Sequence, residues 1–278
     1  MTAPLFIDRN GHRSWIKWHR GRRNAADPVF TGKRILEAMH LGASVEVDLV
    51  VHADHGLAVL HDLTLDRETT GHGPVGAAQA ETLRKLHLRD NAGQPIADNV
   101  LLLEDLCALL TREKPHPDAL LQLDFKEDAA ALDDRTVANF ATSIAALGPH
   151  MIVSGGDAAA VARLADAVPG MRRGYDPCYG PSLAQLQADG DFVRFTNEAL
   201  AVAPGADLIY LHHEIVLEAD SAGYDMIAAI HAAGHRVDAW TIRQVTPASL
   251  SQVERLLALK VDQITTDDPE GLTMALRA

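Results

Sequence analysis

The sequence predicts an α/β fold of the (β/α)8 TIM-barrel class, in which eight parallel strands alternate with helices around a closed sheet. Strand-like and helix-like segments alternate along the chain, and the main strand-like segments number eight. The length of 278 residues suits one such barrel, because this class takes about 250 residues. An open doubly wound sheet is the alternative, but no Gly-x-Gly-x-x-Gly motif follows a strand. We therefore expect residues 1–278 to form one domain.

The first quarter of the chain contains two of these strands. Residues 15–19 alternate between two faces, with lysine and histidine on the same face. A polar loop leads to a helix at 30–40, and a strand rich in valine follows at 45–51. The apolar run at 57–61 is expected to pair back onto that strand through a turn at His55-Gly56.

Residues 62–99 are polar and irregular, with clustered glycines. A loop of this length in a compact domain usually serves function, so we expect an insertion after the second strand, near the active-site mouth. A helix at 102–112 and a strand at 120–125 follow, and the strand alternates polar residues with leucine and phenylalanine.

The second half repeats strand and helix. The strands are short apolar runs, expected at residues 151–153, 171–175, 208–212, 237–242 and 263–266. The helices are expected at residues 134–147, 182–188, 221–232 and 247–259. Asp157 is a typical residue to cap a further helix, which begins after Ser154-Gly-Gly156. Gly234 is a typical residue to end the helix expected at 221–232.

Composition narrows the possible partners. The net charge of −13 argues against nucleic acid and against anionic membranes, because both need a basic surface. Cys107 and Cys178 are too few for a disulfide framework. The N-terminus shows no signal peptide, and no run approaches the length of a membrane span. We expect a cytoplasmic protein without stable membrane association, and the sequence predicts no particular oligomeric state.

The strand at 45–51 carries two carboxylates on one face. Glu46 and Asp48 alternate with valine and leucine, so both acids point the same way. Inside a sheet these acids are costly to bury unless something neutralises them. A divalent cation with oxygen ligands is one solution. The other interpretation is an amphipathic edge strand whose acidic face is wet, and the strand alone leaves both open.

Further polar residues occur where the predicted strands end, which is where barrels of this class carry their active sites. They are His19, Arg20, Glu46, Asp48, His61, Asp62, Asp124, Lys126, Trp240, Thr266 and Asp267. A barrel interior is normally filled with branched apolar side chains, so this concentration of charge at one end indicates a site.

The order and spacing of these residues resemble the glycerophosphodiester phosphodiesterase family. The motifs are His19-Arg20-Gly21, Gly42-x-x-x-Glu46-Val-Asp48, Val59-Leu-His61-Asp62, Leu65-Asp-Arg67, Thr69-Thr-Gly71, Gln122-x-Asp124-x-Lys126, Trp240-Thr-Ile and Thr265-Thr-Asp267-x-Pro269. They are densest between residues 19 and 71. The resemblance implies metal-dependent hydrolysis of a small anionic phosphodiester to glycerol 3-phosphate and an alcohol.

The resemblance also implies a role for each site residue. Glu46, Asp48 and Asp124 would hold one Mg²⁺ or Ca²⁺ ion. His19 and His61 would be the acid–base pair, which suits a pH near 7. Arg20 and Lys126 would bind the substrate phosphate, and we assign Trp240 to substrate contact.

Two departures from the family pattern concern the site. Asp124 stands where the family usually has the longer Glu, and Arg243 stands where Asn is common after the Trp-Thr motif. Asp is usual in the related sphingomyelinase D-like phospholipases, so a metal is still expected. A lysophospholipase D or sphingomyelinase D-like activity is the alternative enzyme. It predicts an apolar groove or a flexible apolar loop near the mouth, and the mostly polar residues 62–99 count against it. An alternative of another class is a catalytically silent metal- or ligand-binding barrel.

Overall fold

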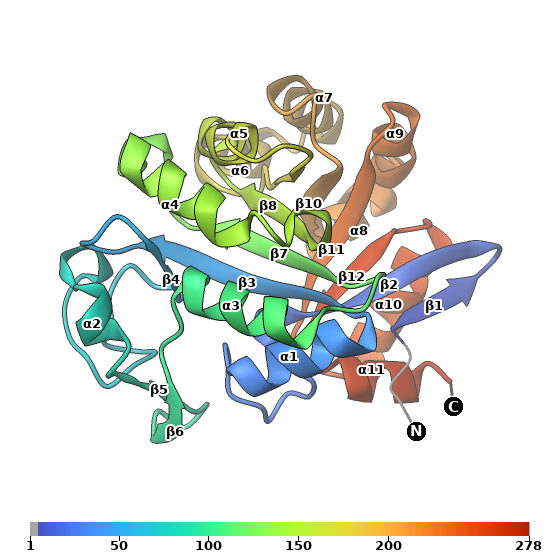
Figure 1. The fold of residues 1–278 in the computed structure, drawn as a ribbon. Coiled ribbons are helices and arrows are strands. Elements are labelled where there is room, and N and C mark those ends of the chain that lie inside the picture. The colour runs from blue at the N-terminus through green and yellow to red at the C-terminus, as the bar shows by residue number, and fades with distance from the viewer. Residues whose placement is uncertain (1–4, 278) are drawn as a thin grey trace.

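The computed structural model describes residues 5–277 (Figure 1). The expectation of no signal peptide rests partly on residues 1–4, which lie outside the described residues. Within residues 5–277, no helix combines the length and the apolar character that crossing a bilayer requires.

Eight parallel strands form a closed barrel, which confirms the predicted fold class. In order around the barrel they are β2 (His12–Trp18), β3 (Ser44–Val51), β7 (Leu120–Phe125), β8 (Met151–Gly155), β9 (Arg172–Tyr175), β10 (Leu208–His212), β11 (Arg236–Ile242) and β12 (Gln263–Thr266). The pairing of β12 with β2 and of β2 with β3 closes the sheet. Parallel closure brings all eight carboxyl ends to one face of the barrel.

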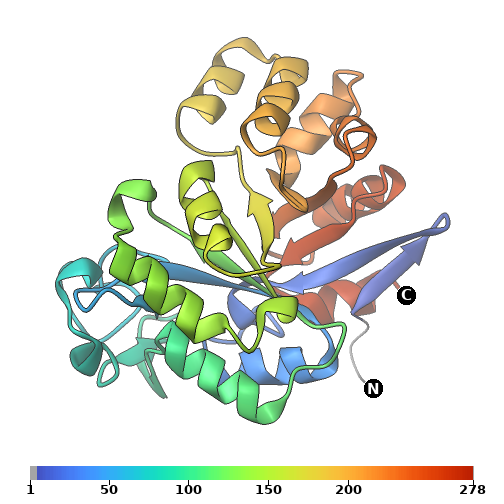
Figure 2. The same cartoon turned by 45° about the horizontal axis from the view of Figure 1, so that its top comes forward.

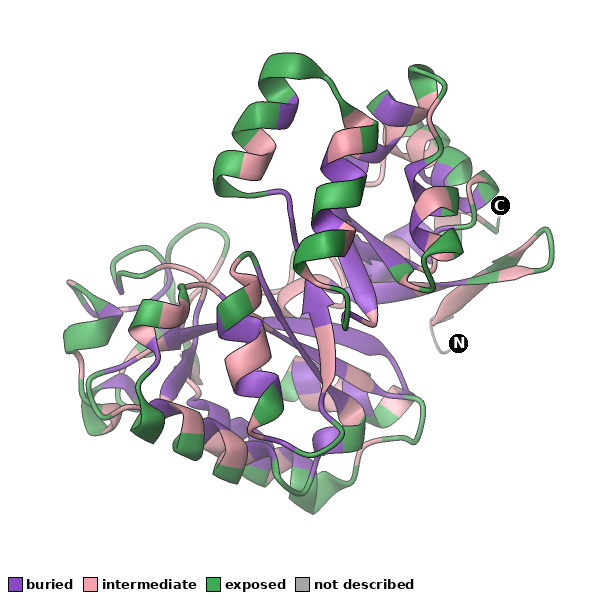
Figure 3. Cartoon of the chain, turned by 90° about the horizontal axis from the view of Figure 1, so that it is seen from above, coloured by how far each residue is buried: buried purple, intermediate pink, exposed green. Residues whose placement is uncertain are grey.

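Helices surround the barrel, and Figure 2 shows them outside the strands. They are α1 (Gly32–Leu41), α3 (Leu103–Glu113), α4 (Asp134–Ile144), α5 (Ala158–Asp166), α6 (Gly180–Asp189), α7 (Phe192–Val202), α8 (His213–Ser221), α9 (Met226–Ala232), α10 (Pro247–Ala258) and α11 (Pro269–Ala275). The barrel strands are mostly buried, while the helices bury one face and expose the other (Figure 3). The apolar core therefore lies between the sheet and the helices.

The helix assignments from the sequence need correction in the second half of the chain. The helix expected at 221–232 starts too early, because α8 ends at Ser221 and a turn containing Gly223, at φ +86°, precedes α9. Helices α7, α8 and α11 were not predicted. Gly190 ends α6 in the left-handed region, at φ +66°, and Asp191 then caps α7 by accepting the Arg194 N–H.

Antiparallel additions extend the sheet at two places. Strand β1 (Phe6–Arg9) pairs with β2, and β4 (Leu57–Val59) pairs with β3 as predicted. Residues 62–99 are less irregular than expected, since they contain α2 (Ala80–Leu83) and a hairpin of β5 (His87–Arg89) and β6 (Pro95–Asn99). They lie beside β4, on the left of Figure 1. The assignment of residues 1–278 to one domain, with 62–99 as an insertion, stays a prediction.

The inside of the barrel is partly polar. Lys17 of β2 and Asp238 of β11 are 1% and 0% exposed, and their Nζ and Oδ2 atoms lie 2.9 Å apart. Gln263 donates to the Ser44 hydroxyl at 2.6 Å, although β2 separates their two strands. Contacts between strands that are not neighbours must cross the barrel interior. Hydrogen bonds and an ion pair thus occupy part of the space that branched apolar side chains usually fill.

Candidate active site

Strands β3 and β7 bring the three predicted metal ligands together. Asp48 of β3 lies directly opposite Asp124 of β7 in the sheet register, and Glu46 precedes Asp48 on the same face. One carboxylate oxygen from each of the three lies within 4.8 Å of the others. Asp124 therefore reaches the cluster although it is one methylene shorter than Glu.

The carboxylates of β3 are buried, which excludes the edge-strand interpretation. Glu46 is 4% and Asp48 1% exposed, and β3 lies between β2 and β7. Burial raises the pKa of Glu46 well above its ordinary value, and the charges of Asp48 and Asp124 add to this effect. Burial also acts on Asp48, but Lys126 and Arg20 outweigh it and lower the pKa of Asp48.

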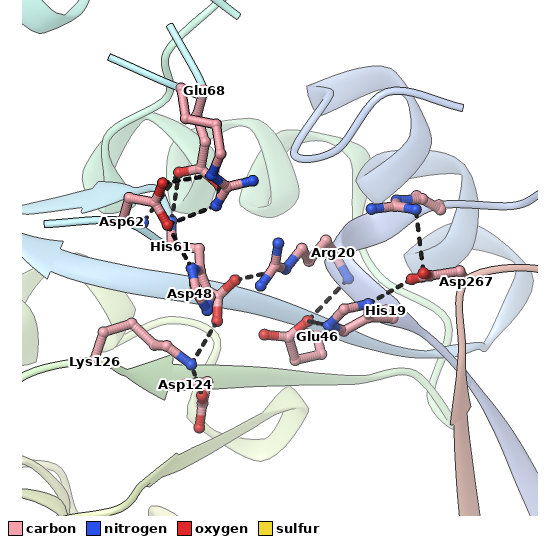
Figure 4. A network of polar contacts seen from close by, with 12 residues as sticks. His19, Arg20, Glu46, Asp48, His61, Asp62, Glu68, Asp124, Lys126 and Asp267 are labelled. Carbon is pink, nitrogen blue, oxygen red and sulfur yellow. Dashed lines mark hydrogen bonds and ion pairs between the residues drawn. The ribbon is translucent and has the colours of Figure 1, made fainter. Parts of the chain in front are cut away.

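Two cations contact these acids (Figure 4). Arg20 Nε lies 3.0 Å from Asp48 Oδ2, and the Arg20 backbone N–H donates to Glu46 at 2.9 Å. The backbone of Arg20 is in the left-handed region, at φ +53°. Lys126 Nζ lies 3.1 Å from Asp48 and 2.8 Å from Asp124. The predicted phosphate-binding residues thus lie against the predicted metal ligands.

His19 is oriented by a carboxylate that was not assigned a role from the sequence. Its Nδ1 lies 2.6 Å from Asp267 Oδ1, and its Nε2 lies 3.9 Å from Glu46. Arg22 holds the other Asp267 oxygen at 3.3 Å. Burial lowers the pKa of His19, and the hydrogen bond with Asp267 offsets part of that effect. The Thr265-Thr-Asp267 motif was the available signal for this partner.

His61, on the other side of the carboxylates, is held in a similar way. Its Nδ1 lies 2.8 Å from Asp62, and Arg67 binds both Asp62 oxygens, at 2.6 and 2.5 Å. The hydrogen bond with Arg67 lowers the pKa of Asp62 to about 2. Glu68 accepts the backbone N–H groups of His61 and Asp62, at 2.9 and 3.1 Å. His61, Asp62 and Glu68 also lie close enough to one another to hold an ion.

All eight predicted site residues line one cavity of about 250 Å³ at the carboxyl ends of the strands. They are His19, Arg20, Glu46, Asp48, His61, Asp124, Lys126 and Trp240. The Trp240 ring stacks on Tyr179, with ring centroids 6.0 Å apart. The buried Asp176 also lines the cavity and was not predicted. The roles assigned to these residues from the sequence stay predictions.

The donor set suits a divalent cation. Glu46, Asp48 and Asp124 supply hard carboxylate oxygens, the ligands that Mg²⁺ and Ca²⁺ prefer. In this structure Arg20 and Lys126 each contact an Asp48 oxygen. Their positive charges balance part of the negative charge of the three carboxylates. The residues present therefore fit a site for one such ion.

Comparison with solved structures finds the same fold. A glycerophosphoryl diester phosphodiesterase from Parabacteroides distasonis is 20% identical, with a TM-score of 0.68 over 98% of this chain and 89% of that one. A glycerophosphodiester phosphodiesterase from Thermotoga maritima is 19% identical, with a TM-score of 0.65 over 96% and 99%. A phosphodiesterase from Oleispira antarctica, in complex with the product sn-glycerol-3-phosphate, is 18% identical, with a TM-score of 0.66 over 95% and 96%.

Comparison with curated protein sequences finds no match. The family model described as the glycerophosphoryl diester phosphodiesterase family matches residues 19–271, which is almost the whole chain. The match begins at His19 and includes His61 and all three clustered carboxylates. The chain belongs to the glycerophosphoryl diester phosphodiesterase family, whose members are phosphoric diester hydrolases.

Proposed function

We propose that this enzyme hydrolyses glycerophosphodiesters to glycerol 3-phosphate and an alcohol, using one Mg²⁺ or Ca²⁺ ion. The observation that carries the proposal is the arrangement of His19 and His61 beside three clustered carboxylates (Figure 4). Family membership supports it. The product bound to the Oleispira antarctica phosphodiesterase supports the same class of substrate. The cytoplasmic location predicted from the sequence stays a prediction.

The substrate is an anion, so the site must first neutralise it. Arg20 and Lys126 offer donors at the cavity wall, and a guanidinium suits two phosphate oxygens at once. Glu46, Asp48 and Asp124 would hold the cation, which when bound supplies positive charge for the phosphoryl oxygens and the attacking group. Trp240 would pack against the carbon part of the substrate.

The histidines would move the protons. Because Nδ1 of His19 and of His61 each faces a carboxylate, that nitrogen carries hydrogen and Nε2 is left to exchange a proton. One imidazole would take the proton of the nucleophile, and the other would return a proton to the leaving alkoxide. Asp267 and Asp62 would keep the two rings in these orientations and would stabilise each imidazolium when it forms.

A substrate panel tests the proposal. The purified protein should release glycerol 3-phosphate from glycerophosphocholine or glycerophosphoethanolamine, measured with a coupled dehydrogenase assay. Excess chelator should abolish the reaction, because it removes the positive charge that the ion would supply to the phosphoryl oxygens and the attacking group, and added Mg²⁺ or Ca²⁺ should restore it. Activity that survives exhaustive chelation would contradict the metal assignment. Inactivity on every glycerophosphodiester with either ion would favour the silent barrel.

A second candidate, hydrolysis of lysophospholipids, is favoured by one observation. A cavity of about 490 Å³ adjoins the site at Trp240 and is lined partly by Leu183, Leu186, Phe192 and Ile215. Such a surface suits the acyl chain of a lysolipid. If this activity exists, lysophosphatidylcholine should be cleaved beside glycerophosphocholine. Leu183→Lys should then lower kcat/KM for lysophosphatidylcholine, relative to kcat/KM for glycerophosphocholine, about tenfold or more. An enzyme that ignores the lysolipid would exclude it.

A further inference from the structure

A chain of hydrogen bonds runs beneath the clustered carboxylates. Lys17 Nζ donates to Gln122 Oε1, and Gln122 Nε2 donates to Ser154 Oγ at 2.8 Å. Ser154 Oγ in turn donates to Asp124 Oδ1 at 2.6 Å. Lys17, Gln122 and Ser154 are 1%, 5% and 0% exposed, so water competes little for these contacts.

The direction of every bond in this chain is fixed by chemistry. An ammonium has only donors, so the amide oxygen of Gln122 must face Lys17 and its nitrogen must face Ser154. The hydroxyl of Ser154 accepts from that nitrogen and has one hydrogen to give. That hydrogen goes to Asp124, a carboxylate whose Oδ1 lies 2.6 Å away.

The far end of this hydrogen-bond chain is anchored at Lys17. Lys17 Nζ lies 2.9 Å from Asp238 Oδ2, and Thr265 donates to the other Asp238 oxygen at 2.7 Å. The Lys17 ammonium also lies 4.4 Å from the centre of the Tyr210 ring. These partners hold the Lys17 ammonium in the barrel interior, where the Gln122 amide oxygen accepts its hydrogen bond.

We infer that Ser154 and Gln122 are positioning residues that orient the Asp124 carboxylate for a divalent cation, through a hydrogen-bond chain anchored on Lys17. This inference rests on the proposed metal-dependent function. Asp124 Oδ2 meets Lys126 at 2.8 Å, so the chain from Ser154 holds the oxygen that Lys126 does not. A carboxylate oxygen that accepts one hydrogen bond still has a lone pair for a metal.

Asp124 already reaches the cluster with Glu46 and Asp48, although its side chain is one methylene shorter than that of Glu. Fixing the carboxylate beforehand reduces the conformational entropy lost when the ion binds. Residues that hydrogen-bond a metal ligand commonly change metal affinity by about 10–100-fold.

The test measures ion binding rather than turnover. Isothermal titration of the whole protein with Mg²⁺, and separately with Ca²⁺, should give a Kd that Ser154→Ala raises about 10–100-fold. Ser154→Thr keeps a hydroxyl and should recover a substantial part of the affinity. Ser143→Ala is the matched control, because the Ser143 hydroxyl donates to the Asn139 carbonyl on the exposed face of α4, and it should leave Kd unchanged.

The outcomes separate this inference from the proposed function. If the wild-type protein binds the ion and Ser154→Ala binds it equally well, the positioning role is wrong while the metal-dependent reaction stands. If Ser154→Ala and Ser154→Thr lose affinity equally, the hydroxyl is not the cause and the inference is overturned. If the wild-type protein binds neither ion, the inference falls together with the metal part of the proposed function.

Discussion

Replacing either His19 or His61 by alanine is expected to lower kcat by about 10²–10⁴-fold, the usual contribution of a positioned acid or base. Each imidazole lines the cavity beside the clustered carboxylates, with Nδ1 held by Asp267 or Asp62. Alanine leaves the nucleophile or the leaving alkoxide without a proton partner. Steady-state kinetics on glycerophosphocholine, at saturating Mg²⁺ or Ca²⁺, measures the loss.

The control for these variants is another histidine. His40 is exposed in the last turn of α1, and His40→Ala should retain the full rate. Far-UV circular dichroism should show the same spectrum for all three variants. A kcat within about threefold of the wild type for His61→Ala would show that another group, or water, serves at that step.

Lys17→Met is expected to lower the free energy of unfolding by about 3–5 kcal/mol, because it leaves the Asp238 carboxylate buried without its cation. Both side chains are buried inside the barrel, and among residues 5–277 Thr265 is then the remaining side-chain hydrogen-bond donor to Asp238. Chemical denaturation in urea, followed by circular dichroism, measures the change. Variants that unfold irreversibly are compared by their unfolding rates.

A double variant separates the cost of the lone charge from the value of the pair. Lys17→Met with Asp238→Leu removes both charges and should recover a large part of the lost stability, because a buried ion pair contributes little beyond an apolar replacement. Lys85→Met is the control, since Lys85 pairs with Glu81 on the surface and should change stability little. Equal effects of Lys17→Met and Lys85→Met would contradict the account of the barrel interior.

The barrel was predictable because its evidence is local. Alternation along residues 45–51 assigned Glu46 and Asp48 to one face, and the strand-helix repeat gave the fold class. The helices α7 and α8 were missed because short helices joined by Gly190 or by the turn at Gly223 leave a weak periodicity. Tertiary packing stabilises such helices more than their own sequence does.

The site was predictable residue by residue, but its supporting contacts were not. Motif spacing identified the histidines and the carboxylates, all of which line one cavity. The pairing of His19 with Asp267 spans 248 positions in the sequence, and that of Lys17 with Gln122 spans 105. Only closure of the barrel brings such residues together, and no local pattern encodes which strand faces which across the interior.

The hairpin of β3 and β4 makes the enzyme a favourable scaffold for loop grafting. His61 lies two residues beyond β4, and β4 is joined to β3, the strand that carries Glu46 and Asp48. Glu68 fixes the start of the following segment to His61. Foreign sequences grafted at the exposed turn between β5 and β6, residues 91–94, should therefore leave both imidazoles in place, because none of residues 71–98 lines the catalytic cavity.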